Sequence, residues 1–126
     1  MLLVVEFRNY VVACTHLSLT DEDRLASVAI IAQEASRWDK PFFLMGDLND
    51  EPGMPFYKEM QKHFLFLNPS YDKTFPADGP NICIDHVAIF KPATTPESTL
   101  SFYNTWVGEE DYSDHRPLHA KIGIWK

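Results

Sequence analysis

The chain has 126 residues, 45% of them hydrophobic, and a formal net charge of -7 from 18 acidic and 11 basic side chains. This length fits one ordinary domain over residues 1–126, with enough apolar residues for a packed core. The acidic balance argues against a broad basic face that follows a nucleic-acid backbone. The N-terminal run Met1–Val5 lacks the basic flank of a signal peptide and is far too short for a membrane span. We therefore expect a soluble chain, without a signal peptide or membrane span, whose location stays open.

Strand and helix patterns follow one another along the chain. From apolar periodicity, turn formers and caps we expect strands at 2–7 and 10–14, a helix at 20–37, a strand at 42–45, a weaker helix at 56–63, and strands at 82–90, 100–107 and 118–125. Thr20 is a good N-cap for the first helix. The apolar stripe of that helix is expected at Leu25, Val28, Ala29 and Ala32.

The order of these elements predicts a mixed α/β layer, in which helices cover one face of a single β-sheet. The strands carry apolar side chains on both faces, yet only two helices are expected to cover them, so one face lacks a partner layer. Pairing with a second copy of the chain is the commonest way to bury such a face. We therefore expect a homo-oligomer that forms through the exposed sheet face.

Four short segments place polar and ionisable groups at the ends of apolar strands, where loops can gather them into one cleft. They are Thr15-His16-Leu17, Gly46-Asp47-Leu48-Asn49, Ile84-Asp85-His86 and Ser113-Asp114-His115-Arg116-Pro117.

Taken singly, most of these residues also have a purely structural interpretation. His16 fits a hydrogen-bonded histidine at a strand end, and Asp47 and Asn49 fit a turn in which Asx side chains bond their own backbone. Asp85 is harder to explain, because a buried carboxylate without a partner costs several kcal/mol. It needs a histidine, an arginine or a metal ion. His86 is expected to be structural, because alternation along the strand points it away from the face of Asp85.

In this order, the motifs Thr-His, Gly-Asp-x-Asn, Ile-Asp-His and Ser-Asp-His-x-Pro resemble those of the endonuclease/exonuclease/phosphatase superfamily. That superfamily includes deoxyribonuclease I, abasic-site endonucleases, neutral sphingomyelinases and inositol-polyphosphate phosphatases. The resemblance covers Leu2 to Lys126. It implies an α+β fold in which this chain supplies one mixed, mainly antiparallel β-sheet with its helices, half of a four-layer αββα sandwich. It also implies a phosphoesterase that uses a divalent metal ion, Mg²⁺ or Mn²⁺.

The same resemblance implies catalytic roles for five residues. Asp47 would orient or deprotonate the attacking water, and Asn49 would hold the phosphate or the metal environment. His115 would contact the phosphate or act as the base, with Asp85 setting its tautomer and orientation. His16 would contact the phosphate and assist the leaving group. Whether Asp47 or His115 is the base stays open.

The metal ligands implied by the resemblance are Asp114, Asp47 and Asn49. Complete family enzymes also have an N-terminal half that supplies an early Asn and a Glu, the principal metal ligand, and neither has a counterpart here. We therefore expect the isolated chain to be poorly active. The alternative is a non-catalytic, oligomeric half-domain with a structural or binding role. Within the catalytic interpretation, the acidic balance favours a small or lipid phosphodiester over long DNA as the substrate.

Overall fold

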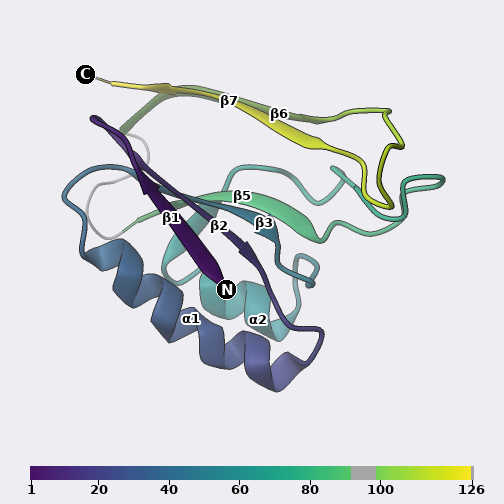
Figure 1. Ribbon diagram of the computed structural model, residues 1–126, viewed down its shortest axis with the longest axis horizontal. Coiled ribbons are helices and arrows are strands. Elements are labelled where there is room, and N and C mark those ends of the chain that lie inside the picture. The colour runs from purple at the N-terminus through teal and green to yellow at the C-terminus, as the bar shows by residue number, and fades with distance from the viewer. Residues whose placement is uncertain (92–98, 126) are drawn as a thin grey trace.

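The computed structural model describes residues 1–91 and 99–125 (Figure 1). Its strands are β1 (Leu2–Glu6), β2 (Val11–His16), β3 (Phe42–Asp47), β4 (Phe64–Phe66), β5 (Asp85–Phe90), β6 (Leu100–Val107) and β7 (Leu118–Ile124), and its helices are α1 (Asp21–Ser36) and α2 (Pro55–Met60). The expected elements are all present, and β4 is an additional short strand. Within the described ranges no helix is both long and apolar enough to cross a bilayer.

The main sheet has five strands in the order β1-β2-β3-β5-β4. Strands β2 and β3 are parallel, because α1 returns the chain between them, and the other neighbours pair antiparallel. The pairing register places His16 opposite Asp47, and Asp47 opposite Asp85. Directly paired residues share a face of the sheet, so these three side chains form a row across β2, β3 and β5.

One face of this sheet carries both helices and the larger hydrophobic core (Figure 1). Helix α1 buries Arg24, Val28, Ile31 and Ala35, so its inward stripe differs from the expected one. Leu25 is 42% exposed, and that part of the prediction was wrong. Apolar residues lie around much of α1, so local periodicity could not tell which of them face the sheet. Arg24 is buried because it pairs with Asp21 and donates to the Ser18 carbonyl.

The opposite face is covered in part by a separate two-stranded sheet, β6-β7. Its inner residues pack against Phe43, Val87 and Ile89 of the main sheet, together with Leu67. The expected fold class is confirmed, with one difference: strands 100–107 and 118–124 leave the main sheet and form a layer of their own. The expectation that nothing covers this face was therefore wrong over β3 and β5. Over the edge strand β1 the face stays open, where Leu3 is 57% and Val5 43% exposed.

Candidate active site

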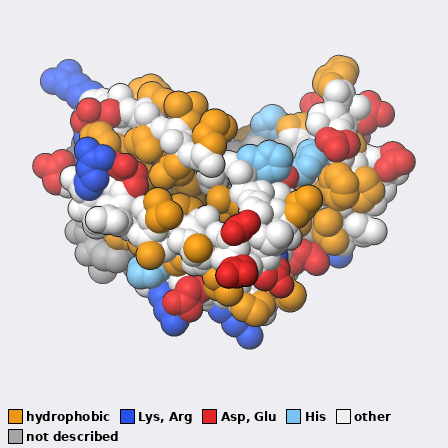
Figure 2. All heavy atoms as spheres, turned by 60° about the horizontal axis from the view of Figure 1, so that its bottom comes forward, with side chains coloured by type: hydrophobic (Ala, Val, Ile, Leu, Met, Phe, Trp, Pro, Cys, Tyr) orange, Lys and Arg blue, Asp and Glu red, His pale blue; other side chains and the backbone are white. Residues whose placement is uncertain are grey.

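The row of paired residues lies on the face that β6-β7 partly cover, at the end of the strands. The Nε2 atom of His16 lies 3.3 Å from Oδ2 of Asp47. The His16 side chain is largely exposed, whereas those of Asp47 and Asp85 are partly buried. The space-filling view shows histidine side chains gathered beside a notch in the molecular surface (Figure 2).

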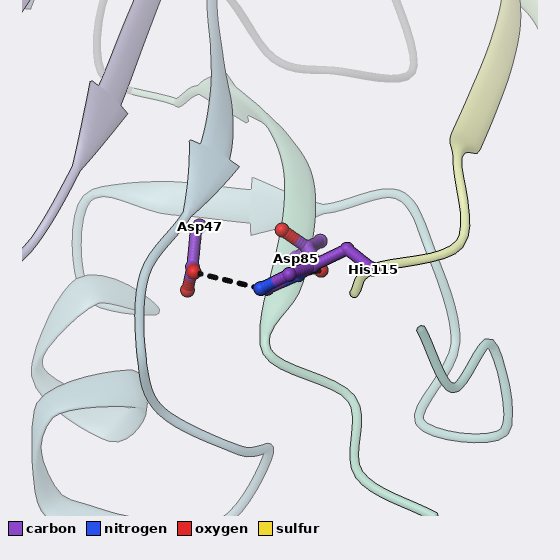
Figure 3. A group of neighbouring side chains, drawn as sticks. All are labelled: Asp47, Asp85 and His115. Atoms are coloured by element: carbon purple, nitrogen blue, oxygen red, sulfur yellow. Dashed lines mark hydrogen bonds and ion pairs between the residues drawn. The ribbon is translucent and has the colours of Figure 1, made fainter. Parts of the chain in front are cut away.

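His115 reaches this row from the loop between β6 and β7. Its Nδ1 atom lies 2.7 Å from Oδ2 of Asp85, and its Nε2 atom lies 3.5 Å from Oδ2 of Asp47. The imidazole ring thus stands between two carboxylates that come from neighbouring strands (Figure 3). The structure thereby gives Asp85 the partner that a buried carboxylate needs.

The turn after β3 holds the Asp47 carboxylate in place. Gly46 has φ 141° and pairs so closely with Thr15 that a Cβ atom would lie 1.9 Å from the Thr15 carbonyl oxygen. Asn49 has φ 53°, and its backbone N–H donates to Asp47 Oδ1 at 2.9 Å. Its side-chain amide donates to the Leu17 carbonyl at 2.7 Å. One carboxylate oxygen of Asp47 is therefore bound by the turn, while the other faces the two histidines.

Burial and neighbouring charge shift the pKa values of this group. Burial raises the pKa of Asp47 above its ordinary value, and the charge of Asp85 adds to the rise, while the Asn49 amide and the histidines oppose it. Burial opposes protonation of His115, but its hydrogen bond to Asp85 and the nearby carboxylate charges outweigh burial. The pKa of His115 therefore lies above its ordinary value. A protonated His115 can bind an anion, and Asp47 can accept a proton from water.

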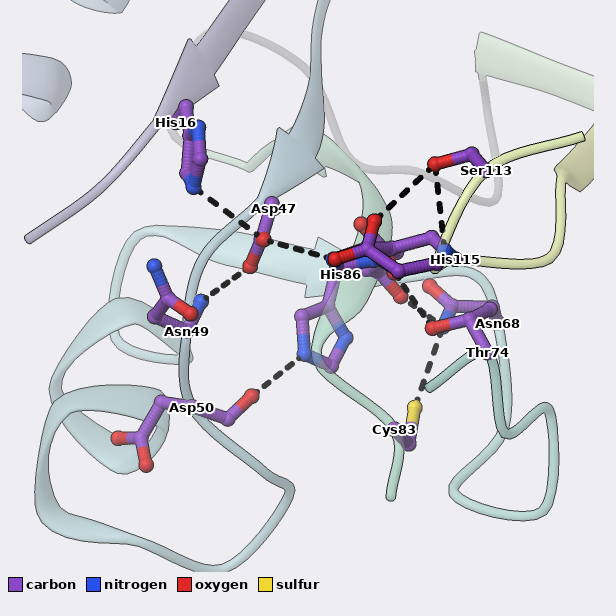
Figure 4. Close-up of polar contacts among 12 residues, drawn as sticks. His16, Asp47, Asn49, Asp50, Asn68, Thr74, Cys83, His86, Ser113 and His115 are labelled. Carbon is purple, nitrogen blue, oxygen red and sulfur yellow. Dashed lines mark hydrogen bonds and ion pairs between the residues drawn. The ribbon is translucent and has the colours of Figure 1, made fainter. Parts of the chain in front are cut away.

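Two residues that the motifs did not indicate also contact Asp85. The Thr74 hydroxyl donates to Asp85 Oδ2, and the Asn68 side-chain amide donates to the Asp85 carbonyl at 3.1 Å (Figure 4). The Asn68 Oδ1 atom accepts from the Val87 N–H at 2.8 Å. Both residues come from the long polar loop between β4 and β5, where no periodicity indicates which side chains turn inward.

His86 and Asp114 lie apart from this hydrogen-bonded group. His86 is buried on the helix side, where Nε2 bonds the Asp50 carbonyl at 2.8 Å and the ring packs against Tyr57 and Phe66. Burial lowers the pKa of His86. Asp114 is exposed beside His115 and accepts a hydrogen bond from the Ser113 hydroxyl at 3.1 Å.

Some described side chains of the site could bind a divalent cation. Asp47, Asp85 and His115 form a group whose candidate ligand atoms all lie within 4.8 Å of one another, and the expected ligand Asp114 is not part of it. A cation beside Asp47 would offset the burial and the nearby Asp85 charge that raise the pKa of its carboxyl group. Mg²⁺ prefers about six oxygen ligands in octahedral geometry, so this chain fits it only in part.

The sequence profile of the Endonuclease/Exonuclease/phosphatase family matches residues 4–115. The chain belongs to this family, as its four motifs implied.

The chain is also similar to individual members and solved structures. Protein YbhP of Escherichia coli K12 is 27% identical to this chain, in an alignment that covers 90% of this chain and 46% of YbhP. The endonuclease/exonuclease/phosphatase from Bacteroides vulgatus superposes with TM-score 0.72 at 18% identity, covering 92% of this chain and 50% of that one. The mannosyl-6-phosphatase of Bacteroides thetaiotaomicron VPI-5482 superposes with TM-score 0.64 at 17% identity, covering 90% and 51%. The chain thus has the fold of these structures and spans about half the length of its relatives.

Proposed function

We propose that this chain supplies the described site to a divalent-metal-dependent phosphoesterase. The observation that carries the proposal is the His115 ring, 2.7 Å from Asp85 and 3.5 Å from Asp47. A histidine held by one carboxylate and facing another combines an anion-binding group with a proton acceptor. Family membership and a mannosyl-6-phosphatase among the structural neighbours support hydrolysis of a phosphate ester.

In the proposed reaction, a water oxygen bonds to phosphorus and the bond from phosphorus to the leaving oxygen breaks. Asp47 orients this water and accepts one of its protons, and His16 gives a proton to the leaving oxygen. His115, oriented by Asp85, contacts the phosphoryl oxygens. Asp47 is the proposed base because the raised pKa of His115 favours its protonated, anion-binding form.

A bound Mg²⁺ or Mn²⁺ would neutralise charge on the phosphoryl oxygens. Asp47, Asn49 and Asp114 are the ligands that we propose this chain offers. The Asn49 amide nitrogen is engaged by the Leu17 carbonyl, so its side-chain oxygen is the atom available for a cation or a phosphate. We propose that the remaining ligands, an Asn and a Glu, lie outside these 126 residues, in the part of the domain that the chain does not span.

Isothermal titration calorimetry tests whether the ligand set is incomplete. We expect only weak Mg²⁺ binding to the 126-residue chain, because few oxygen ligands converge on one point. Tight, stoichiometric binding would mean that the chain holds the cation without help.

We propose a small or lipid phosphodiester as the substrate, in preference to long DNA. The formal net charge of -7 supports this choice, because a duplex backbone is bound mainly through many basic contacts. Among the described residues, the two carboxylates of the site pair with histidines. Such a site suits a single phosphate more than an extended polyanion.

Hydrolysis assays test the activity and its metal dependence together. The protein that contains the complete family domain is incubated with Mg²⁺ or Mn²⁺ and bis-p-nitrophenyl phosphate, sphingomyelin, an inositol polyphosphate or nicked DNA. We expect phosphodiester hydrolysis that EDTA abolishes and that Asp47→Asn lowers by about 10²-fold or more. Asp39→Asn, at an exposed acid outside the site, is the matched control. Undiminished hydrolysis in Asp47→Asn would refute the assigned role.

A second candidate is a non-catalytic half-domain that acts as a homo-oligomer. Exposed Leu3 and Val5 on the edge strand β1 favour it, because an apolar edge strand readily pairs with another chain. Sedimentation equilibrium at micromolar concentration distinguishes a dimer from a 14.5 kDa monomer. A dimer that Leu3→Lys disrupts would support pairing through this face, and a monomer would rule it out.

A further inference from the structure

Thr74 is fully buried, and its hydroxyl contacts the Asp85 carboxylate. Its relative exposure is 0%, and its Oγ1 atom donates to Oδ2 of Asp85. The same carboxylate oxygen lies 2.7 Å from Nδ1 of His115. A carboxylate oxygen that accepts the Thr74 proton can also accept one from Nδ1, so this contact favours a His115 ring with a proton on Nδ1, while Nε2 points toward Asp47. Two contacts therefore meet on one oxygen and restrain the orientation of the carboxylate.

The backbone of Thr74 is held on both sides. Its N–H donates to the Ile82 carbonyl at 3.0 Å, and its carbonyl accepts from the Arg116 N–H at 2.7 Å. Arg116 follows His115 directly in the chain. Thr74 therefore contacts Asp85 through its side chain, and through its carbonyl it contacts Arg116, the residue that follows His115.

Neighbours of Thr74 reinforce this connection. The Ala77 N–H donates to the Asp114 carbonyl at 2.8 Å, and Nε of Arg116 donates to the Ala77 carbonyl at 2.7 Å. The Phe75 ring packs on the His115 ring, with centroids 4.9 Å apart. Residues 74–77 thus lie along the loop on both sides of His115.

We propose that Thr74 is a positioning residue of the site. Its hydroxyl holds Asp85 in the orientation that accepts the His115 Nδ1 proton, and its carbonyl anchors the loop of His115 at the correct distance. Removing the hydroxyl frees the Asp85 carboxylate to rotate, and His115 then loses its fixed tautomer. The consequence for catalysis rests on the proposed function, whereas the consequence for the His115 ring does not.

Three variants separate the hydroxyl from the volume of the side chain. Thr74→Val keeps the shape and removes the hydroxyl, and Thr74→Ser keeps the hydroxyl and removes a methyl group. Thr105→Val is the matched control, because it removes another threonine-to-aspartate hydrogen bond, Thr105 Oγ1 to Asp72 Oδ2 at 2.7 Å, that does not involve Asp85 or His115.

Long-range ¹⁵N–¹H correlation spectra of the 126-residue chain, recorded at a pH above the raised pKa of His115, where the ring holds one proton, show which ring nitrogen carries it. We expect the Nδ1–H form in the wild type, in Thr74→Ser and in Thr105→Val, and a mixture of tautomers in Thr74→Val. An unchanged His115 spectrum in Thr74→Val overturns the proposal, as does the same mixture in Thr74→Ser. If Thr74→Val does not fold, the wild type decides: a slowly exchanging Thr74 hydroxyl proton is expected, and a rapidly exchanging one counts against the proposal.

Kinetics in the complete family domain give the second readout. Thr74→Val should lower kcat by about 10- to 100-fold, a typical effect of losing an orienting hydrogen bond, and leave KM nearly unchanged. Thr74→Ser should retain most of kcat, and Thr105→Val should be unaffected. Equal loss in Thr105→Val overturns the positioning role. A wild type without hydrolytic activity counts against the proposed function alone, because the tautomer of His115 is measured without substrate.

Discussion

The two faces of the five-stranded sheet are built from the same strands but differ in what they do. On the helix face α1 and α2 close a continuous core around Val11, Leu44 and Phe56. On the other face a smaller core around Phe43 and Ile89 lies beside the ionisable row. The strand alternation of β5 shows this division within two adjacent residues, since Asp85 joins the row and His86 enters the helix-side core. The larger hydrophobic core thus lies on one face, and the ionisable row lies on the other.

The largest effect is expected on turnover from substitutions in the row. His115→Ala and Asp47→Ala should each lower kcat in the complete family domain by about 10²- to 10⁴-fold, as expected for a lost base or phosphate contact. Urea denaturation should show that both variants keep most of the wild-type free energy of unfolding. A fully active His115→Ala or Asp47→Ala enzyme would contradict the assignment of chemistry to this face.

Phe42 and Phe43 are adjacent in β3 and belong to different cores, so substituting each in turn compares how much the two cores contribute to stability. Phe42→Ala should lower the free energy of unfolding by about 3–5 kcal/mol, because Phe42 is buried among the helices and Phe64. Phe43→Ala should cost less, because it faces the two-stranded sheet, which can move inward to fill the space. Urea denaturation of both variants measures the difference. If Phe43→Ala is the more damaging change, the site face carries more of the stability than we infer.

Gly46 lies near the end of β3, where it pairs with Thr15 of β2 and directly precedes Asp47. Gly46→Ala places a Cβ atom 1.9 Å from the Thr15 carbonyl oxygen at φ 141°, so the strand must shift. We expect a loss of about 1–3 kcal/mol in unfolding free energy, together with reduced turnover because Asp47 moves. Gly79→Ala is the control, since a Cβ atom there meets nothing within 4 Å. Equal stability of the two alanine variants would show that the β2–β3 approach is not tight.

The smallest effect is a difference in pH dependence between the two histidines that flank the sheet. Burial lowers the pKa of His86 below 6.5, so on acidification the unfolded chain gains a proton that the folded chain resists, and stability falls. The pKa of His115 is raised, so its contribution is present at low pH and is lost as pH rises through the folded pKa.

Unfolding of the chain in EDTA, measured from about pH 7 to about pH 5, separates these contributions. The decline in stability on acidification should be smaller in His86→Gln than in the wild type, and larger in His115→Gln. Parallel curves for the three proteins would show that neither histidine is linked to folding in this range.

Local pattern was sufficient for the elements and for the motifs at their ends. Strand alternation separates Asp85 from His86, and the Gly-Asp-x-Asn turn follows from the need for a close approach at Gly46 and a positive φ at Asn49. The strand alternation and the turn each depend on residues within a few positions of one another. The family followed from the order of the four motifs, and the family profile confirms it.

The arrangement that makes the site depends on contacts between distant segments. Nothing near Leu100–Val107 in the sequence indicates that this strand leaves the main sheet to pair with Leu118–Ile124 as a second layer. The same holds for Arg24 on the buried stripe of α1 and for Thr74, which reaches Asp85 from a loop without periodicity. The sequence by itself determined the strands and the ionisable motifs at their ends, because strand ends and turns are local. Only the tertiary structure decided how His115 meets Asp85 and Asp47, because strand pairing and loop docking are chosen by the packing energy of the whole chain.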